Sequence, residues 1–138
     1  MFEQCLYFNT TSLARMLERE WGRVFKPYGL TPAQAFMLRV ILAKAPISHT
    51  DLASVMNIAK ATCSRTVEGL IKMGFVLRSQ ADVDGRSFEL SPSEQALAIA
   101  QEINEASARV TQKIQEKIGP DEFRETVAAL RMIGSAIG

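Results

Sequence analysis

Histidine and cysteine are scarce in this sequence. His49 is the only histidine, and the two cysteines, Cys5 and Cys63, lie far apart in the chain. A single histidine excludes metal sites built from several histidines and gives no basis for a conventional catalytic triad. Two isolated cysteines form neither a zinc cluster nor a disulfide scaffold. No G-x-G-x-x-G, P-loop, G-x-S-x-G or H-E-x-x-H pattern occurs, so we expect no catalytic residue, no metal and no cofactor.

Long apolar runs and a dominant charge are absent too. No stretch of about 18 uncharged apolar residues occurs, and the opening Met1-Phe2-Glu3-Gln4 lacks the basic and apolar regions of a secretion signal. We therefore expect a cytoplasmic protein with no membrane partner. Sixteen Lys and Arg residues against fifteen Asp and Glu give a net charge of +1. Any case for nucleic acid binding then depends on where the charges lie.

Helix starts, in contrast, are easy to recognise. Thr31-Pro32-Ala33-Gln34 has the pattern of a capping box with proline at the first helical position, and it predicts a helix to about Lys44. Ser48 followed by Asp51 three residues later predicts a second, short helix over 48–55. Asn57 tolerates the positive φ of a tight turn. A third helix is predicted over 59–73, ending at Gly74.

The predicted helix 59–73 is amphipathic. Its inward face carries Cys63, Val67, Leu70 and Ile71 at helical spacing. Two helices joined by a turn of three to four residues make a helix-turn-helix. Segments 75–80 and 86–90 then predict two strands, joined through an Asp84-Gly85 turn. The fold class that we expect is mainly α with a small β-hairpin wing (α+β), a winged helix-turn-helix over residues 30–90.

Longer amphipathic helices flank this region. Ser91-Pro92-Ser93-Glu94 predicts the start of a long helix, and Gly119-Pro120 begins another, while an apolar stripe from Leu6 to Phe25 marks an opening helix. These helices offer more apolar surface than a monomer of this size covers. We therefore assign residues 1–29 and 91–138 to dimerisation and expect a homodimer with two-fold symmetry.

The helix 59–73 presents small and polar side chains at its amino-terminal end, as a helix that enters the major groove requires. Arg65 can donate to guanine O6 and N7 or to a phosphate, Arg78 to a phosphate, and Arg86 suits a narrow minor groove. The alternative for each of these residues is an ordinary solvated surface. The predicted DNA-contacting residues are Ser48, Thr50, Lys60, Ala61, Thr62, Ser64, Arg65, Arg78 and Arg86.

The two cysteines have different expected roles. Cys63 lies on the inward stripe and is expected to be a small core residue. Cys5 precedes Leu6-Tyr7-Phe8 near the start of the first helix, where a thiol pKa can be lowered and the thiol can act as an oxidation sensor. Partial burial of Cys5 in the dimer is the alternative that we favour.

Three segments and one leucine are informative together: Asn57-Ile58-Ala59-Lys60-Ala61-Thr62-Cys63-Ser64-Arg65-Thr66-Val67, then Leu70, then Gly74-Phe75-Val76, then Asp84-Gly85-Arg86. In these residues and in the order of its predicted elements, essentially the whole chain resembles the MarR family of winged helix-turn-helix transcriptional regulators. The resemblance implies a triangular dimer on a pseudo-palindromic operator in double-stranded DNA, with the helix from residue 59 in the major groove and Arg86 in the minor groove.

The resemblance also suggests how the protein is regulated. Family members commonly bind a small aromatic or anionic ligand in a cleft between the dimer helices and the winged region, which releases DNA, so the expected function is that of a ligand-released repressor. The early cysteine is similar to that of the organic-hydroperoxide-sensing branch, although the helix that begins Pro32-Ala33-Gln34-Ala35-Phe36 carries no tyrosine. Two alternatives therefore stay open: an oxidation sensor acting through Cys5, and a winged-helix protein-interaction module that does not bind DNA.

Overall fold

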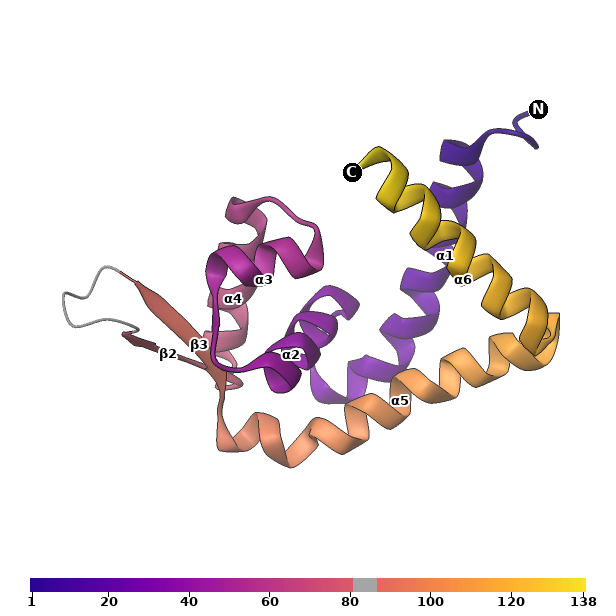
Figure 1. Ribbon diagram of the computed structural model, residues 1–138. Coiled ribbons are helices and arrows are strands. Elements are labelled where there is room, and N and C mark those ends of the chain that lie inside the picture. Colours follow the sequence, from indigo (N-terminus) through magenta and orange to yellow (C-terminus); the bar gives the residue numbers. More distant parts are fainter. Residues whose placement is uncertain (81–86) are drawn as a thin grey trace.

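The computed structural model describes residues 1–80 and 87–138 and is mainly helical (Figure 1). A winged region lies at one end of the molecule, and long helices extend from it to the other end, where both chain termini are found. The elements in chain order are α1 (Leu6–Phe25), the 3-10 turn η1 (Lys26–Tyr28), α2 (Pro32–Lys44), β1 (Ile47–Ser48), α3 (His49–Met56), α4 (Lys60–Lys72), β2 (Val76–Gln80), β3 (Phe88–Pro92), α5 (Glu94–Ile118) and α6 (Pro120–Ile137).

The predicted helix caps form as hydrogen bonds. The Thr31 hydroxyl accepts from the Gln34 backbone N–H at 3.2 Å, and the Gln34 side-chain oxygen accepts from the Thr31 N–H at 3.0 Å, which completes a capping box at the start of α2. The Ser48 hydroxyl accepts from the Asp51 N–H at 3.1 Å and begins α3. These bonds satisfy N–H groups that a helix start otherwise leaves without an intrahelical acceptor. Both predicted starts are confirmed.

Positive φ angles mark the two turns that frame α4. Asn57 has φ 54° after α3, and Gly74 has φ 83° after α4. The positive φ favours glycine at position 74, and a Cβ there would also lie 2.9 Å from the Gln95 Oε1 atom, so the Gln95 side chain would have to shift. The helix between these turns begins at Lys60 and ends at Lys72, within a residue of the predicted limits.

The wing is a three-stranded antiparallel sheet in the order β1-β3-β2. Val76 pairs with Pro92 and Gln80 with Phe88, so the predicted hairpin strands are confirmed in type. Strand β1 was not expected from the sequence, since it is only two residues long and pairs Ile47 with the distant Leu90. The expected turn at 84–85 and the first residue of the predicted second strand lie outside the described residues.

The start of α5 corrects the sequence prediction. The segment Ser91-Pro92-Ser93-Glu94 does not cap a helix at its first serine, because Ser91 and Pro92 belong to β3. Ser93 is the N-cap, and its hydroxyl accepts from the Ala96 N–H at 3.2 Å. Proline has no backbone N–H to donate to a neighbouring strand, so it is tolerated at the end of β3, where this hydrogen bond is not required.

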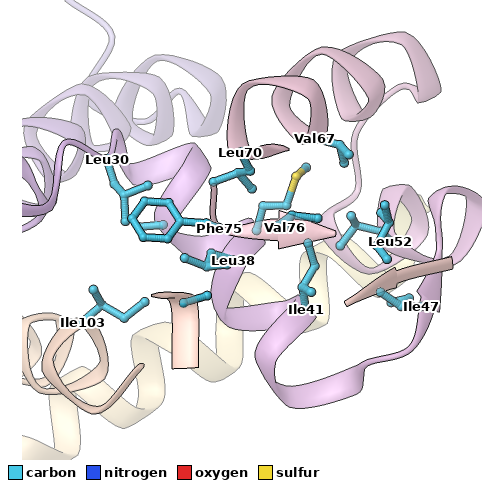
Figure 2. Close-up of a cluster of buried hydrophobic side chains, with 14 of the residues drawn as sticks. Leu30, Leu38, Ile41, Ile47, Leu52, Val67, Leu70, Phe75, Val76 and Ile103 are labelled. Carbon is cyan, nitrogen blue, oxygen red and sulfur yellow. The ribbon is translucent and has the colours of Figure 1, made fainter. Parts of the chain in front are cut away.

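One hydrophobic core joins the winged region to the long helices (Figure 2). Side chains from α2, α3, α4 and the sheet meet there with Phe25 of α1 and Ile103 of α5, and both of these are fully buried. The predicted inward stripe of α4 is confirmed for Cys63, Val67 and Leu70, each 0% exposed, whereas Ile71 is only partly buried. Burial of this stripe fixes which face of α4 points outward.

The far ends of the long helices lack such a core. Helix α6 is 18 residues long and has no buried residue. Most of its apolar side chains and those at the start of α1 are exposed, among them Leu6, Tyr7, Phe8, Leu13, Val127, Leu130, Met132 and Ile137. Over the described part of the chain, no helix is both long and apolar enough to cross a membrane.

Candidate nucleic-acid interface

Helix α4 presents a polar face at the surface of the winged region. The buried stripe holds the helix by one side, and the predicted contact residues lie on the other. All five of them on this helix are exposed: Lys60, Ala61, Thr62, Ser64 and Arg65. The structure thus brings together the part of the predicted set that is expected to read the major groove.

The amino-terminus of α4 has no side-chain cap. Ala59 stands at the N-cap position and makes no cap hydrogen bond, and the first turn carries no acid. The first N–H groups of a helix lack intrahelical acceptors and carry partial positive charge. Together with Lys60, they form a surface that favours an anion such as a DNA phosphate.

Arg65 is the strongest candidate for a base contact. Its Nη2 atom lies 3.4 Å from the Thr62 hydroxyl, so the side chain runs back toward the amino-terminus of α4. The Thr66 hydroxyl donates to the Thr62 carbonyl at 3.0 Å, a local bond within the helix. Among the ion pairs of the described residues, none involves Arg65, so its guanidinium remains available to DNA.

Two of the predicted contacts lie at the start of α3: Ser48 ends β1 and is the N-cap, and Thr50 is in the first turn. Thr50 is exposed, whereas Ser48 is half-buried and its oxygen already accepts from the Asp51 N–H. The Ser48 hydroxyl proton is still available as a donor. Whether either residue contacts DNA stays a prediction.

Arg78, which the sequence analysis assigns to a phosphate contact, already has a charged partner. It lies on β2 and forms an ion pair with Glu68 of α4, and its guanidinium lies 5.7 Å from the centre of the Phe88 ring. A phosphate contact by Arg78 would have to share or displace this partner. The other wing cation in the predicted set, Arg86, lies outside the described residues.

His49 and Cys63 occupy the junction between α3 and α4. Burial, and then the nearby Arg78 cation, lower the pKa of His49, while Glu68 opposes them. The Cys63 thiol donates to the His49 carbonyl oxygen at 3.7 Å, and burial raises its pKa. Cys63 is therefore a core residue, as predicted, and a poor nucleophile.

Cys5, unlike the buried Cys63, lies at the surface of the protein. It is exposed and is the N-cap of α1, where its sulfur accepts from the Phe8 N–H at 3.5 Å. The predicted position at a helix start is confirmed. The redox role remains a prediction.

An apolar groove lies between α1 and α2, at the base of the winged region. Its lining includes Leu17 and Trp21 of α1 together with Pro32, Ala33 and Phe36 of α2. The sequence pattern marked Leu17 and Trp21 only as part of an apolar stripe, and nothing in it identified Phe36 as a groove residue. In the part of the chain that is described, no cluster of three or more His, Cys, Asp or Glu side chains has the arrangement of a metal site.

The fold and the exposed helix define a winged helix-turn-helix protein, and comparison with known proteins shows what it is similar to. Residues 30–88, almost the whole winged region, match the MarR family. The HTH-type transcriptional regulator BilQ of Clostridioides difficile is 24% identical over 111 residues, which are 80% of this chain and 75% of BilQ.

Two solved structures share the fold over nearly the entire chain. The transcriptional repressor CouR, bound to a 23-mer DNA duplex, matches with a TM-score of 0.89 at 20% identity and covers 96% of this chain and 94% of its own. The Staphylococcus aureus MepR–DNA complex matches with a TM-score of 0.88 at 13% identity, covering 97% and 99%. The chain is therefore similar to the MarR family of transcriptional regulators, in sequence over its winged region and in fold over nearly its whole length. The family whose model matches and the curated relative are transcriptional regulators, as the sequence analysis expects.

Proposed function

We propose that this protein is a sequence-specific DNA-binding regulator that inserts α4 into the major groove of double-stranded DNA. The observation that carries the proposal is the exposed polar face at the amino-terminal end of α4, next to an uncapped helix start. CouR and MepR, which share this fold, were both solved with DNA. In such a complex Arg65 donates to guanine O6 and N7 or to a phosphate, and the small Ala61 lets the helix approach the bases closely.

The active form that we propose is a homodimer on a pseudo-palindromic operator. Helix α6, with no buried residue, and the exposed apolar start of α1 need a partner surface, because patches of this kind mark interfaces in soluble proteins. A second copy supplies a matching surface through two-fold symmetry. Dimerisation also doubles the number of phosphate contacts, which matters for a chain with a net charge of only +1.

The regulatory role that we propose is repression that a small ligand relieves. The groove lined by Leu17, Trp21 and Phe36 is almost entirely apolar and suits an aromatic ring. Arg39 lies 4.9 Å from the centre of the Phe36 ring, so a cation lies beside the groove for a ligand that also carries a negative charge. Because α1 and α2 form the two walls, a bound ligand acts on the junction between the winged region and the dimer helices.

A salt titration on random-sequence duplex tests the DNA-binding proposal. Phosphate contacts release counter-ions, so affinity is expected to fall steeply and linearly in a log–log plot against salt concentration. Arg65→Ala is expected to weaken binding to a selected operator more than binding to random duplex. A protein-interaction module without DNA binding would show no measurable affinity for duplex at low salt, and that result would reject the proposal.

Oxidation sensing through Cys5 is a second candidate, which the exposure of the thiol at the start of α1 favours. In this version mild peroxide converts the thiolate to a sulfenic acid, and the change at α1 releases DNA. Wild type is then expected to lose DNA on peroxide treatment, whereas Cys5→Ser keeps it. Equal behaviour of the two proteins would remove this candidate.

A further inference from the structure

Three helices meet at one buried hydroxyl group. Ser107 of α5 is 6% exposed, and its oxygen accepts a hydrogen bond of 3.0 Å from the Trp21 indole N–H of α1. The same oxygen accepts a second bond of 3.0 Å from the Arg39 Nη1 atom of α2. We refer to Trp21, Arg39 and Ser107 as the Ser107 hub. In the part of the chain that is described, no buried side-chain polar atom lacks a partner, so the hub is fully satisfied.

The Arg39 guanidinium is held in one orientation by several contacts at once. Its Nε atom donates to the Asn104 side-chain oxygen at 2.7 Å, and its central carbon, Cζ, lies over the Phe36 ring. Within the described residues Arg39 forms no ion pair, so only neutral groups hold it. Two directional hydrogen bonds from a planar fork to α5 set the rotation of α2 as well as its distance.

The position of the hub connects it to DNA recognition. Helix α2 packs against α4 and also against α1 and α5. Helices α1 and α5 lead to the exposed apolar surfaces that we assign to the dimer. Apolar packing between helices is not directional, so it tolerates small rotations that hydrogen bonds with defined geometry resist.

We propose that Trp21, Arg39 and Ser107 are positioning residues for DNA binding. They hold the winged region in one orientation on α1 and α5, and they thereby fix the separation of the two α4 helices in the dimer. A fixed separation makes the protein selective for the spacing of the two operator half-sites. The inference rests on the proposed function, because it needs a dimer that binds DNA, and it assigns to the hub a role that the apolar core alone does not provide.

The test compares two duplexes that carry the same half-sites. The operator is first selected from genomic DNA with the wild-type protein, and a second duplex is made with two base pairs inserted between its half-sites. The insertion turns one half-site by about 70° around the helix axis and moves it by about 7 Å. Wild type is expected to bind the original duplex at least about tenfold more tightly than the expanded one, a difference similar to that caused by a mismatched base pair.

Ser107→Ala removes the acceptor that both donors share. The spacing ratio is the affinity for the original duplex divided by the affinity for the expanded one. We expect Ser107→Ala to lower this ratio to about threefold or less, because a winged region that is held less firmly adapts to the longer duplex. Trp21→Phe removes only one of the two bonds and is expected to give an intermediate ratio. A ratio is the right measurement, since a loss of folded protein lowers both affinities equally and leaves the ratio unchanged.

Tyr28→Phe is the matched control. The Tyr28 hydroxyl also links the winged side to α5, donating to Glu102 at 3.4 Å, but this bond is long, exposed and outside the hub. We expect Tyr28→Phe to keep the wild-type ratio. Because Trp21 is the only tryptophan, its fluorescence gives an independent signal, and Ser107→Ala is expected to change its emission whereas Tyr28→Phe does not.

The possible results separate the two proposals. Failure of the wild type to bind duplex DNA would reject the proposed function itself. The role of the hub would be overturned if the wild type binds with strong spacing selectivity and Ser107→Ala retains that selectivity. It would also be overturned if Tyr28→Phe loses as much selectivity as Ser107→Ala does. A reduced ratio in Ser107→Ala, with Trp21→Phe between it and the wild type, supports the role.

Discussion

Glu68 of α4 and Arg78 of β2 form an ion pair that joins α4 to the wing. Glu68 is the only acid between residues 59 and 73, and its partner cancels a negative charge that would otherwise face DNA phosphates. Both side chains are partly exposed, so the pair contributes little to the free energy of unfolding. Its main consequence is electrostatic, on the face that we assign to DNA.

Glu68→Gln is expected to strengthen DNA binding. The substitution removes the acid and leaves the Arg78 guanidinium free to contact a phosphate, a gain of about two- to fivefold in affinity at low salt. Fluorescence anisotropy on operator duplex measures the change. In the Glu68→Gln background, Arg78→Gln should lower the affinity again, because no acid is left to be exposed and only the phosphate contact of Arg78 is lost. An unchanged or weaker affinity of Glu68→Gln itself would contradict a phosphate contact by Arg78.

Arg65→Ala is expected to cost about 1–3 kcal/mol of binding free energy on the operator if the guanidinium makes a bidentate contact to guanine. Lys72→Ala is the matched control, since Lys72 is an exposed cation at the opposite end of α4. If Lys72 contacts a phosphate, Lys72→Ala should weaken binding by similar amounts on all DNA sequences. Equal losses for both variants on operator and random duplex would rule out base reading by Arg65.

His49 predicts a dependence of stability on pH. Its pKa is lowered from 6.5 in the folded protein, chiefly by burial, so the unfolded chain takes up a proton first as the pH falls. The free energy of unfolding should therefore decrease as the pH drops below about 6.5, until the folded protein is protonated as well. Urea unfolding at pH 7.5 and 5.5 measures this loss. His49→Gln should show a smaller loss between these values, and an identical loss would assign the effect to other groups.

The two thiols should differ sharply in reactivity. Cys5 is exposed, whereas Cys63 is buried and burial raises its pKa. A maleimide reagent at neutral pH is expected to label one thiol of the native protein quickly and the second only after unfolding. Mass spectrometry of Cys5→Ser, which should remain unlabelled while folded, provides the control. Fast labelling of that variant would show that the α3–α4 junction opens readily.

Local signals in the sequence predicted much of this fold. The caps at Thr31 and Ser48, and the stop at Gly74, depend on residues within three or four positions of one another, and each predicted element was found. Contacts between distant residues left no such signal. Strand β1 exists only because Ile47 pairs with Leu90, and the Ser107 hub joins residues 86 and 68 positions apart.

The candidate site was predicted in the same uneven way. The outward face of α4 follows from its own periodicity, so its exposed residues could be named in advance. The partner of Arg78 could not, because Glu68 lies on a different element and comes close only when the sheet packs on α4. A serine in the middle of a long helix gives no indication that two other helices donate to it.

The most direct test of the account is a methylation-protection footprint of the wild-type protein on an operator selected from genomic DNA. Two α4 helices held by one dimer should protect guanine N7 atoms in two major-groove patches, centred about one helical turn, 10–10.5 base pairs, or a multiple of it apart. The predicted result is a symmetric pair of patches that weakens on both sides in Arg65→Ala. A single protected patch, or protection confined to the minor groove, would contradict the account.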